Sequence, residues 1–146
     1  MKERNKLPIS VQLLLEKEDK ILLMKRKNTG YEDGKYSLPG GHVESNEEIR
    51  KALIREAKEE IGVKIDLQDI ELYKVLNRKV SKEQEYIDFI FKANHWTGSI
   101  TNEEKEKCEE IKWVDINKIP ENTLNFIPKM LKEKDSIYLS YNWEEK

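Results

Sequence analysis

One helix, with its two ends and the acids it carries, restricts the fold of this chain more than any other feature. Ser45-x-x-Glu48 fits a capping box, in which the hydroxyl and the carboxylate satisfy free backbone N–H groups of the first helical turn. Gly62 stands where a left-handed residue ends a helix. Together these features predict a helix over residues 46–61.

Acidic side chains interrupt the apolar side of this helix. At about 100° per residue, one side collects three apolar residues: Ile49, Ala52 and Leu53. An amphipathic helix would continue this side with apolar residues, but Glu56 and Glu60 stand there and Glu59 flanks them. Like charges at this spacing repel each other, so we expect a cation to offset them.

Two interpretations of these acids remain open. A solvated helix with surface ion pairs is one, since Arg55 can pair with Glu59 four residues further on. A divalent-metal site is the other, because clustered carboxylate oxygens suit Mg²⁺ or Mn²⁺, with substrate phosphates completing the coordination shell. The position of Glu56 and Glu60 on the otherwise apolar side favours the metal site.

Strand patterns occur on both sides of this helix in the sequence. Residues 10–18 and 20–27 form a predicted hairpin, and a loop over 28–36 leads to a short extended segment and the Gly40-Gly41 turn. The later elements are four predicted strands and one helix: residues 64–67, 70–78, 86–95 and 111–114, and then 124–134. This order predicts an α/β fold with a mixed sheet flanked by helices.

The composition is that of a compact globular protein. The 146 residues are 37% hydrophobic and 38% charged, and we expect one domain over 1–146. A net charge of -2 gives no basic field for a nucleic-acid polymer. Cys108 is the only cysteine and no apolar run approaches the ~20 residues that span a bilayer, so we expect a cytoplasmic protein without membrane contact.

The segment 137–143 is rich in aromatic and aliphatic side chains. One interpretation is a tail that docks on its own domain. The alternative is a contact with a partner, including a second copy of the chain in a homodimer.

A longer pattern contains the acids of the helix. Gly41, Glu47, Arg55-Glu56, Glu59-Glu60 and Gly62 follow one another with five, seven, two and one intervening residues. With apolar residues at 57 and 63, the segment 41–63 resembles the signature of the Nudix hydrolase family at every position. Residues 38–44 and 112–115 also resemble this family, and the resemblance covers residues 9–134. It implies a Nudix α/β/α sandwich.

The resemblance implies roles for residues of this segment. The implied metal ligands are three carboxylates and one backbone carbonyl: Glu56, Glu59, Glu60 and Gly41. Glu59 would join the other ligands or assist the attacking water. Glu47 and Arg55 would support the catalytic group by fixing the turn to the helix through an ion pair. Members of the family differ in their general base, so this assignment stays open.

An acidic loop supplies a further candidate. In a subgroup of the family this loop reads Asn-x-Glu-Pro-x-Lys-Cys, and residues 102–108 match it except that Lys105 replaces the proline. The resemblance makes Glu104 a candidate loop acid near the metal. A solvated loop is the alternative.

Four residues outside this segment are candidate substrate contacts: Lys25, Arg26, Tyr36 and Phe89. Lys25 and Arg26 end a strand near the expected site, and a guanidinium suits bidentate phosphate contact; plain surface charge is the alternative. Tyr36 and Phe89 can stack on a base or belong to the core.

Family membership implies hydrolysis of a nucleoside diphosphate linked to another moiety, with Mg²⁺ as the cofactor and Mn²⁺ as a substitute. The expected small-molecule substrate is a nucleoside triphosphate, including an oxidised one, as for MutT-like members. ADP-ribose or a nucleotide sugar is the alternative substrate. A nucleotide-sensing module without turnover is the alternative function.

Overall fold

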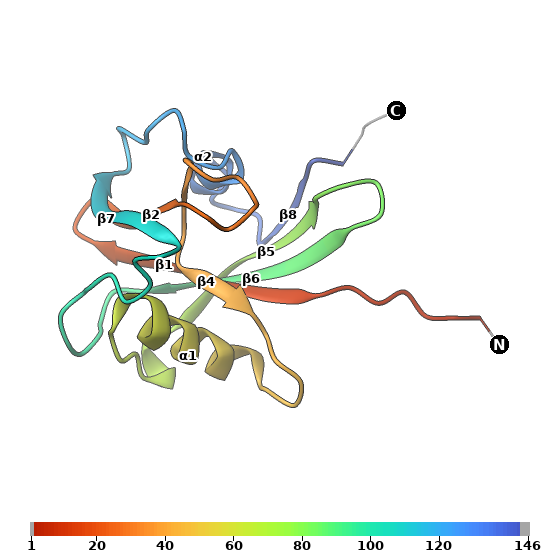
Figure 1. The fold of residues 1–146 in the computed structure, drawn as a ribbon, viewed down its shortest axis with the longest axis horizontal. Coiled ribbons are helices and arrows are strands. Elements are labelled where there is room, and N and C mark those ends of the chain that lie inside the picture. The colour runs from red at the N-terminus through yellow and green to blue at the C-terminus, as the bar shows by residue number, and fades with distance from the viewer. Residues whose placement is uncertain (1, 144–146) are drawn as a thin grey trace.

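The computed structural model describes residues 2–143, so residue 1 and residues 144–146 of the expected domain lie outside it. The elements follow the chain in this order: β1 (Ile9–Lys17), β2 (Lys20–Arg26), β3 (Tyr36–Ser37), β4 (Gly40–His42), α1 (Ile49–Ile61), η1 (Leu67–Asp69), β5 (Glu71–Lys79), β6 (Glu85–Ala93), β7 (Cys108–Asp115), α2 (Phe126–Lys132) and β8 (Tyr138–Tyr141). The fold is α/β, with a mixed sheet between α1 and α2 (Figure 1).

Strand β1 organises the sheet because it pairs with three other strands. It runs antiparallel to β2 and β4 and parallel to β6. β1 and β2 pair only near their shared turn, at Glu16 with Ile21 and Lys17 with Lys20. Beyond this point β2 pairs with β3 and β7, whereas β1 pairs with β4 and β6. The two strands therefore diverge, and the site described below lies between them.

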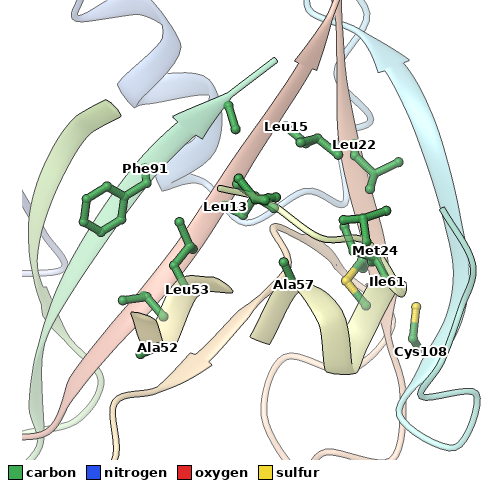
Figure 2. Packing of buried hydrophobic residues seen from close by; sticks show 14 residues of the cluster. Leu13, Leu15, Leu22, Met24, Ala52, Leu53, Ala57, Ile61, Phe91 and Cys108 are labelled. Atoms are coloured by element: carbon green, nitrogen blue, oxygen red, sulfur yellow. The ribbon is translucent and has the colours of Figure 1, made fainter. Parts of the chain in front are cut away.

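Alternating side chains of β1 divide the core into two halves. Leu13 and Leu15 pack with Leu53 and Ile61 of α1 (Figure 2). Leu14 points to the other half, which contains the buried side chains of α2. Burial on both faces explains why the apolar residues of this strand are consecutive rather than alternating.

Helix α1 begins later than the capping-box pattern predicts. Glu48 is the N-cap residue. The predicted start at residue 46 is wrong because Asn46 has a left-handed φ of 62° and the Glu47 N–H donates to the Glu44 carbonyl, closing a turn before the helix. The predicted end is confirmed, since Gly62 adopts a left-handed φ of 72°.

Three later elements differ from their predicted bounds. The predicted strand 64–67 is wrong: Lys64 makes a single bridge with Thr97, and the chain then turns helically through η1, where the Asp69 N–H donates to Asp66. The strand predicted at 111–114 extends to Cys108–Asp115. The helix predicted at 124–134 is shorter, because the Leu124 N–H donates to the Tyr36 carbonyl instead of joining α2.

The C-terminal segment docks on its own sheet, which confirms the first of the two interpretations. β8 pairs parallel with β5, and the indole N–H of Trp143 donates to the Asn77 carbonyl at 3.0 Å. Within residues 2–143, no helix has the length and apolar character needed to span a membrane.

Candidate active site

A cleft of about 870 Å³ opens where β1 and β2 diverge. Its lining includes residues of β1, β2, β4 and α1, of the loop after β2, of the hairpin of β5 and β6, and of the loop before β7. The cleft therefore collects residues that are far apart in the sequence.

Among the carboxylates that line the cleft, four belong to α1 and to the loop before β7: Glu56, Glu59, Glu60 and Glu104. The first three project from α1, and Glu104 belongs to the loop before β7. The charge of Glu104 acts on both Glu56 and Glu60, since it contributes to the raised pKa of each. The structure thus brings the predicted loop acid to the acids of the helix.

Burial dominates the electrostatics of Glu60 and Glu56. The Oε1 atom of Glu60 accepts a 2.6 Å hydrogen bond from the backbone N–H of Gly40. Burial, followed by the charge of Glu56, raises the pKa of Glu60 to about 8. Burial also raises the pKa of Glu56, although Arg55 opposes the shift. The positive charge near these two carboxyl groups is too small to offset their burial and their mutual repulsion. A bound dication would supply the missing charge.

The glycine pair of β4 lets the backbone approach its neighbours closely. A Cβ atom on Gly40 would lie 2.1 Å from the Val11 carbonyl oxygen, and one on Gly41 would lie 2.5 Å from the Glu56 carboxylate. A side chain at Gly41 would therefore displace Glu56, and one at Gly40 would displace β1. The turn places the Gly41 backbone directly beside a predicted metal ligand.

Arg55 connects the acids of α1 to the preceding turn. Its Nε and Nη2 atoms donate to Glu47 at 2.7 and 3.0 Å, and Nη1 donates to Glu56 at 2.9 Å and to Glu59 at 3.2 Å. Nη2 also donates to the His42 carbonyl at 3.0 Å. Hydrogen bonds from Arg55 lower the pKa of Glu47 to about 2. The predicted Glu47–Arg55 ion pair is present and ties the turn and β4 to the helix.

The loop before β7 is attached to the end of α1. The Glu103 N–H donates to the Glu60 carbonyl at 3.0 Å. Asn102 donates from its side chain to the Cys108 carbonyl at 2.8 Å and accepts from the Glu104 N–H at 3.1 Å. These bonds hold Glu104 at the cleft, although the loop lacks the proline of the subgroup.

Arg26 and Lys25 both border the cleft, but they differ in their side-chain contacts. Arg26 donates through Nε to the Tyr31 carbonyl at 2.8 Å and through Nη2 to Thr29 at 3.1 Å. The Lys25 ammonium forms an ion pair with Glu109 at 2.9 Å. Arg26 thus bonds to neutral groups in these contacts, whereas the charge of Lys25 is paired with that of Glu109.

Tyr36 and Phe89 lie outside the cleft lining, in contrast to their expected role as stacking residues. Tyr36 is buried, its hydroxyl donates to Glu110, and the Lys112 ammonium lies 4.6 Å from its ring centroid. Phe89 packs against the core beneath α1. Both rings occupy the core environment that was the alternative interpretation.

Another part of the cleft wall consists of residues that the sequence patterns do not single out. Four residues from the loop after β2 and from β5 and β6 form it: Tyr31, Arg78, Tyr86 and Asp88. We call this group the Arg78 wall. The available sequence signal is Asp88, which stands between Ile87 and Phe89 in β6, because a charged side chain at a buried strand position requires a partner.

Comparison with known proteins agrees with this geometry. A model of the NUDIX domain matches residues 6–134. The chain is a member of the NUDIX domain family. An ADP-ribose pyrophosphatase of Methanocaldococcus jannaschii is 47% identical to this NUDIX protein over 55 residues, which are 38% of this chain and only 32% of the relative. An oxidized purine nucleoside triphosphate hydrolase of Danio rerio is 31% identical over 121 residues, covering 77% of this chain and 73% of the relative.

The fold of this NUDIX protein also matches a solved structure. The crystal structure of a MutT NUDIX hydrolase from Burkholderia pseudomallei superposes with a TM-score of 0.80 and 22% sequence identity. The match covers 90% of this chain and 100% of that chain. At this identity the likeness establishes the shared fold.

The acids of this NUDIX domain suit a hard divalent cation. They offer several carboxylate oxygens as ligands, and a cation would relieve their repulsion and the cost of their burial. Across residues 2–143, no three acidic, histidine or cysteine side chains already surround one point as ligands. Glu60 and Glu56 bond instead to N–H donors of Gly40 and Arg55. A small rearrangement of these side chains would therefore accompany metal binding.

Proposed function

We propose that this NUDIX protein is a divalent-metal-dependent pyrophosphohydrolase that acts on nucleoside triphosphates. The observation that carries the proposal is the group of four carboxylates beside the Gly40-Gly41 turn, at one part of a large cleft. A pyrophosphate bridge is strongly anionic, so acids at its binding site make physical sense only when cations mediate the contact.

Mg²⁺ is the proposed cation, with Mn²⁺ as a substitute. Glu56 and Glu60 would hold it, with the Glu59 carboxylate and the Gly41 carbonyl as additional donors. When bound, the cation would supply Lewis acidity that neutralises charge on the phosphate oxygens.

The remaining residues position the substrate and the attacking water. Arg55 fixes Glu56 and Glu59 through its guanidinium. Arg26 has five N–H donors, and the donors that Tyr31 and Thr29 do not occupy are available to a phosphate. A carboxylate that is not serving as a ligand, Glu59 or Glu104, accepts the proton of the attacking water.

ADP-ribose is a second candidate substrate, and one observation favours it. The Methanocaldococcus relative with 47% identity is named for this substrate, although the match covers 55 residues. The zebrafish relative, whose match covers 121 residues, is named for oxidised purine nucleoside triphosphates. The longer match supports the triphosphate proposal.

A panel of nucleoside triphosphates, their oxidised forms, ADP-ribose and nucleotide sugars tests the proposal. With Mg²⁺ in ¹⁸O-labelled water, we expect a monophosphate and pyrophosphate from a triphosphate, and the labelled product identifies the phosphorus attacked. Glu59→Gln and Glu60→Gln should each lower kcat by about 10² or more without unfolding the protein. Glu71→Gln, at an exposed position of β5, is the matched control. A wild-type protein that cleaves no member of the panel would support a sensing module instead.

A further inference from the structure

The Arg78 wall lines the same cleft as the carboxylates, yet it takes no part in the proposed chemistry. Its centre is an ion pair between strands. Nε and Nη2 of Arg78 donate to the two carboxylate oxygens of Asp88 at 2.8 and 3.1 Å. Asp88 is completely buried, and the Arg78 side chain is 12% exposed.

This pair is electrically neutral as a unit, which distinguishes it from a phosphate clamp. A bidentate guanidinium and carboxylate cancel each other's charge at close range. Two tyrosine rings lie beside the guanidinium, Tyr86 with its centroid 4.6 Å from Cζ and Tyr31 at 5.9 Å. A neutral, planar and partly aromatic surface of this kind suits a flat ring better than an anion.

The guanidinium of this wall offers only hydrogen-bond donors to a ligand. Arg78 carries five N–H groups, of which three bond to Asp88 and to the Tyr31 hydroxyl, the latter at 3.3 Å. Because Tyr31 accepts in this contact, its own O–H remains able to donate. Asp88, the only acid of the wall, is enclosed and already paired. A ligand edge that faces the free N–H groups of Arg78 must therefore present acceptors.

We infer that the Arg78 wall binds the nucleobase and selects bases with a ring carbonyl, such as guanine and uracil and their oxidised forms, over adenine. The inference rests on the proposed function, which places the phosphates at the carboxylates. A ring carbonyl accepts from Arg78 or Tyr31, whereas the exocyclic amino group of adenine is a donor and would face other donors. A buried N–H group without an acceptor costs free energy, so adenine should bind to this wall more weakly than a base that presents a carbonyl.

The test compares turnover of GTP, UTP, ATP and ADP-ribose. We expect the wild-type kcat/KM for GTP and UTP to exceed that for ATP and ADP-ribose by about tenfold or more, the effect of one well-placed hydrogen bond. The double variant Arg78→Met/Asp88→Asn removes both charges of the pair together. It should lose most of this preference, because KM should rise more for GTP than for ATP.

Tyr31→Phe provides a variant that leaves no charge without its partner. It keeps the ring and removes the hydroxyl, and it should lower the GTP to ATP ratio several-fold. If the double variant fails to fold, the GTP to ATP ratio of Tyr31→Phe tests the inference on its own. Tyr138→Phe, at a 57% exposed position of β8, is the matched control and should leave the ratio unchanged.

Calorimetric binding of GMP and AMP separates this inference from the proposed function. GMP binding that exceeds AMP binding, and that weakens in Tyr31→Phe, supports the inference even if no nucleotide is hydrolysed. Efficient turnover with equal use of GTP and ATP, or a preference for ATP or ADP-ribose, overturns the inference and leaves the hydrolase proposal standing. Equal loss of all four substrates in Tyr31→Phe also overturns it.

Discussion

The backbone N–H of Gly40 donates a 2.6 Å hydrogen bond to Oε1 of Glu60, so strand β4 and the last turn of α1 meet at one carboxylate. The bond fixes the orientation of Glu60 within the cleft. A glutamine at this position keeps the bond, because its amide oxygen also accepts. Glu60→Gln therefore changes the charge and little else, which makes it a sharp probe of this site.

The metal-free protein should lose stability as the pH rises from about 5 to about 8. The pKa of Glu60 is raised from 4.5 in the unfolded chain to about 8 in the folded protein. Between these values the folded state binds more protons, so the free energy of unfolding falls with rising pH. Thermal unfolding in EDTA checks this, and Glu60→Gln should show a smaller fall.

Mg²⁺ should reverse this trend, because the cation competes with protons for the same carboxylates. The rise in Tm on adding Mg²⁺ is expected to be larger at pH 8 than at pH 6 and small in Glu60→Gln. A metal-free wild type whose Tm follows that of Glu60→Gln throughout this range would contradict the assigned pKa direction.

Alanine at Gly41 and at Gly40 should have opposite consequences. At Gly41 the new Cβ meets the movable Glu56 carboxylate, so we expect a nearly unchanged Tm with weaker Mg²⁺ activation and lower kcat. At Gly40 it meets the backbone of Val11, so we expect a loss of about 1–3 kcal/mol in stability. Urea unfolding and Mg²⁺ titration of turnover measure both effects. A Gly41→Ala enzyme with wild-type Mg²⁺ dependence would argue against metal binding beside this glycine.

The sequence predicts α1 and its acids well because a local pattern determines them. Glu56 and Glu60 interrupt a helical period that can be counted along the chain, and Gly62 marks the end. The predicted start is wrong because Asn46 takes a left-handed φ and the Glu47 N–H closes a turn onto the Glu44 carbonyl before the helix begins. The capping-box pattern alone does not contain this turn.

The other part of the cleft could not be derived in the same way. Arg78 and Asp88 meet only because β5 and β6 pair in one particular register, and Tyr31 reaches them from a loop 47 residues before Arg78. Tyr36 lies outside the cleft lining because the pairing of β3 with β2 directs it toward Lys112 and Glu110. Strand register and loop position depend on the pairing of the whole sheet, so local sequence patterns do not predict these contacts.

Arg55→Lys should impair catalysis although the charge is kept. A lysine cannot reproduce the bidentate contact with Glu47 together with the bonds to Glu56 and Glu59. We expect kcat/KM to fall by about 10–100-fold, the usual effect of losing a residue that orients metal ligands. Steady-state kinetics over a range of Mg²⁺ concentrations measures this. Arg50→Lys, at an exposed position of α1, is the control, and equal effects in both variants would refute a positioning role for Arg55.

Lys74→Met should destabilise the protein without affecting turnover well below its Tm. Lys74 is 1% exposed, and its ammonium donates to the carbonyls of Glu133 and Ser136 between α2 and β8. Methionine fills a similar volume but leaves both carbonyls without this donor, at a cost of about 1–3 kcal/mol. Urea unfolding should show this loss, and amide exchange should become faster in β8, which pairs with β5 beside the turn. Lys82→Met, in the exposed hairpin loop, should change neither quantity; unchanged exchange in β8 of Lys74→Met would show that the ammonium does not hold the segment in place.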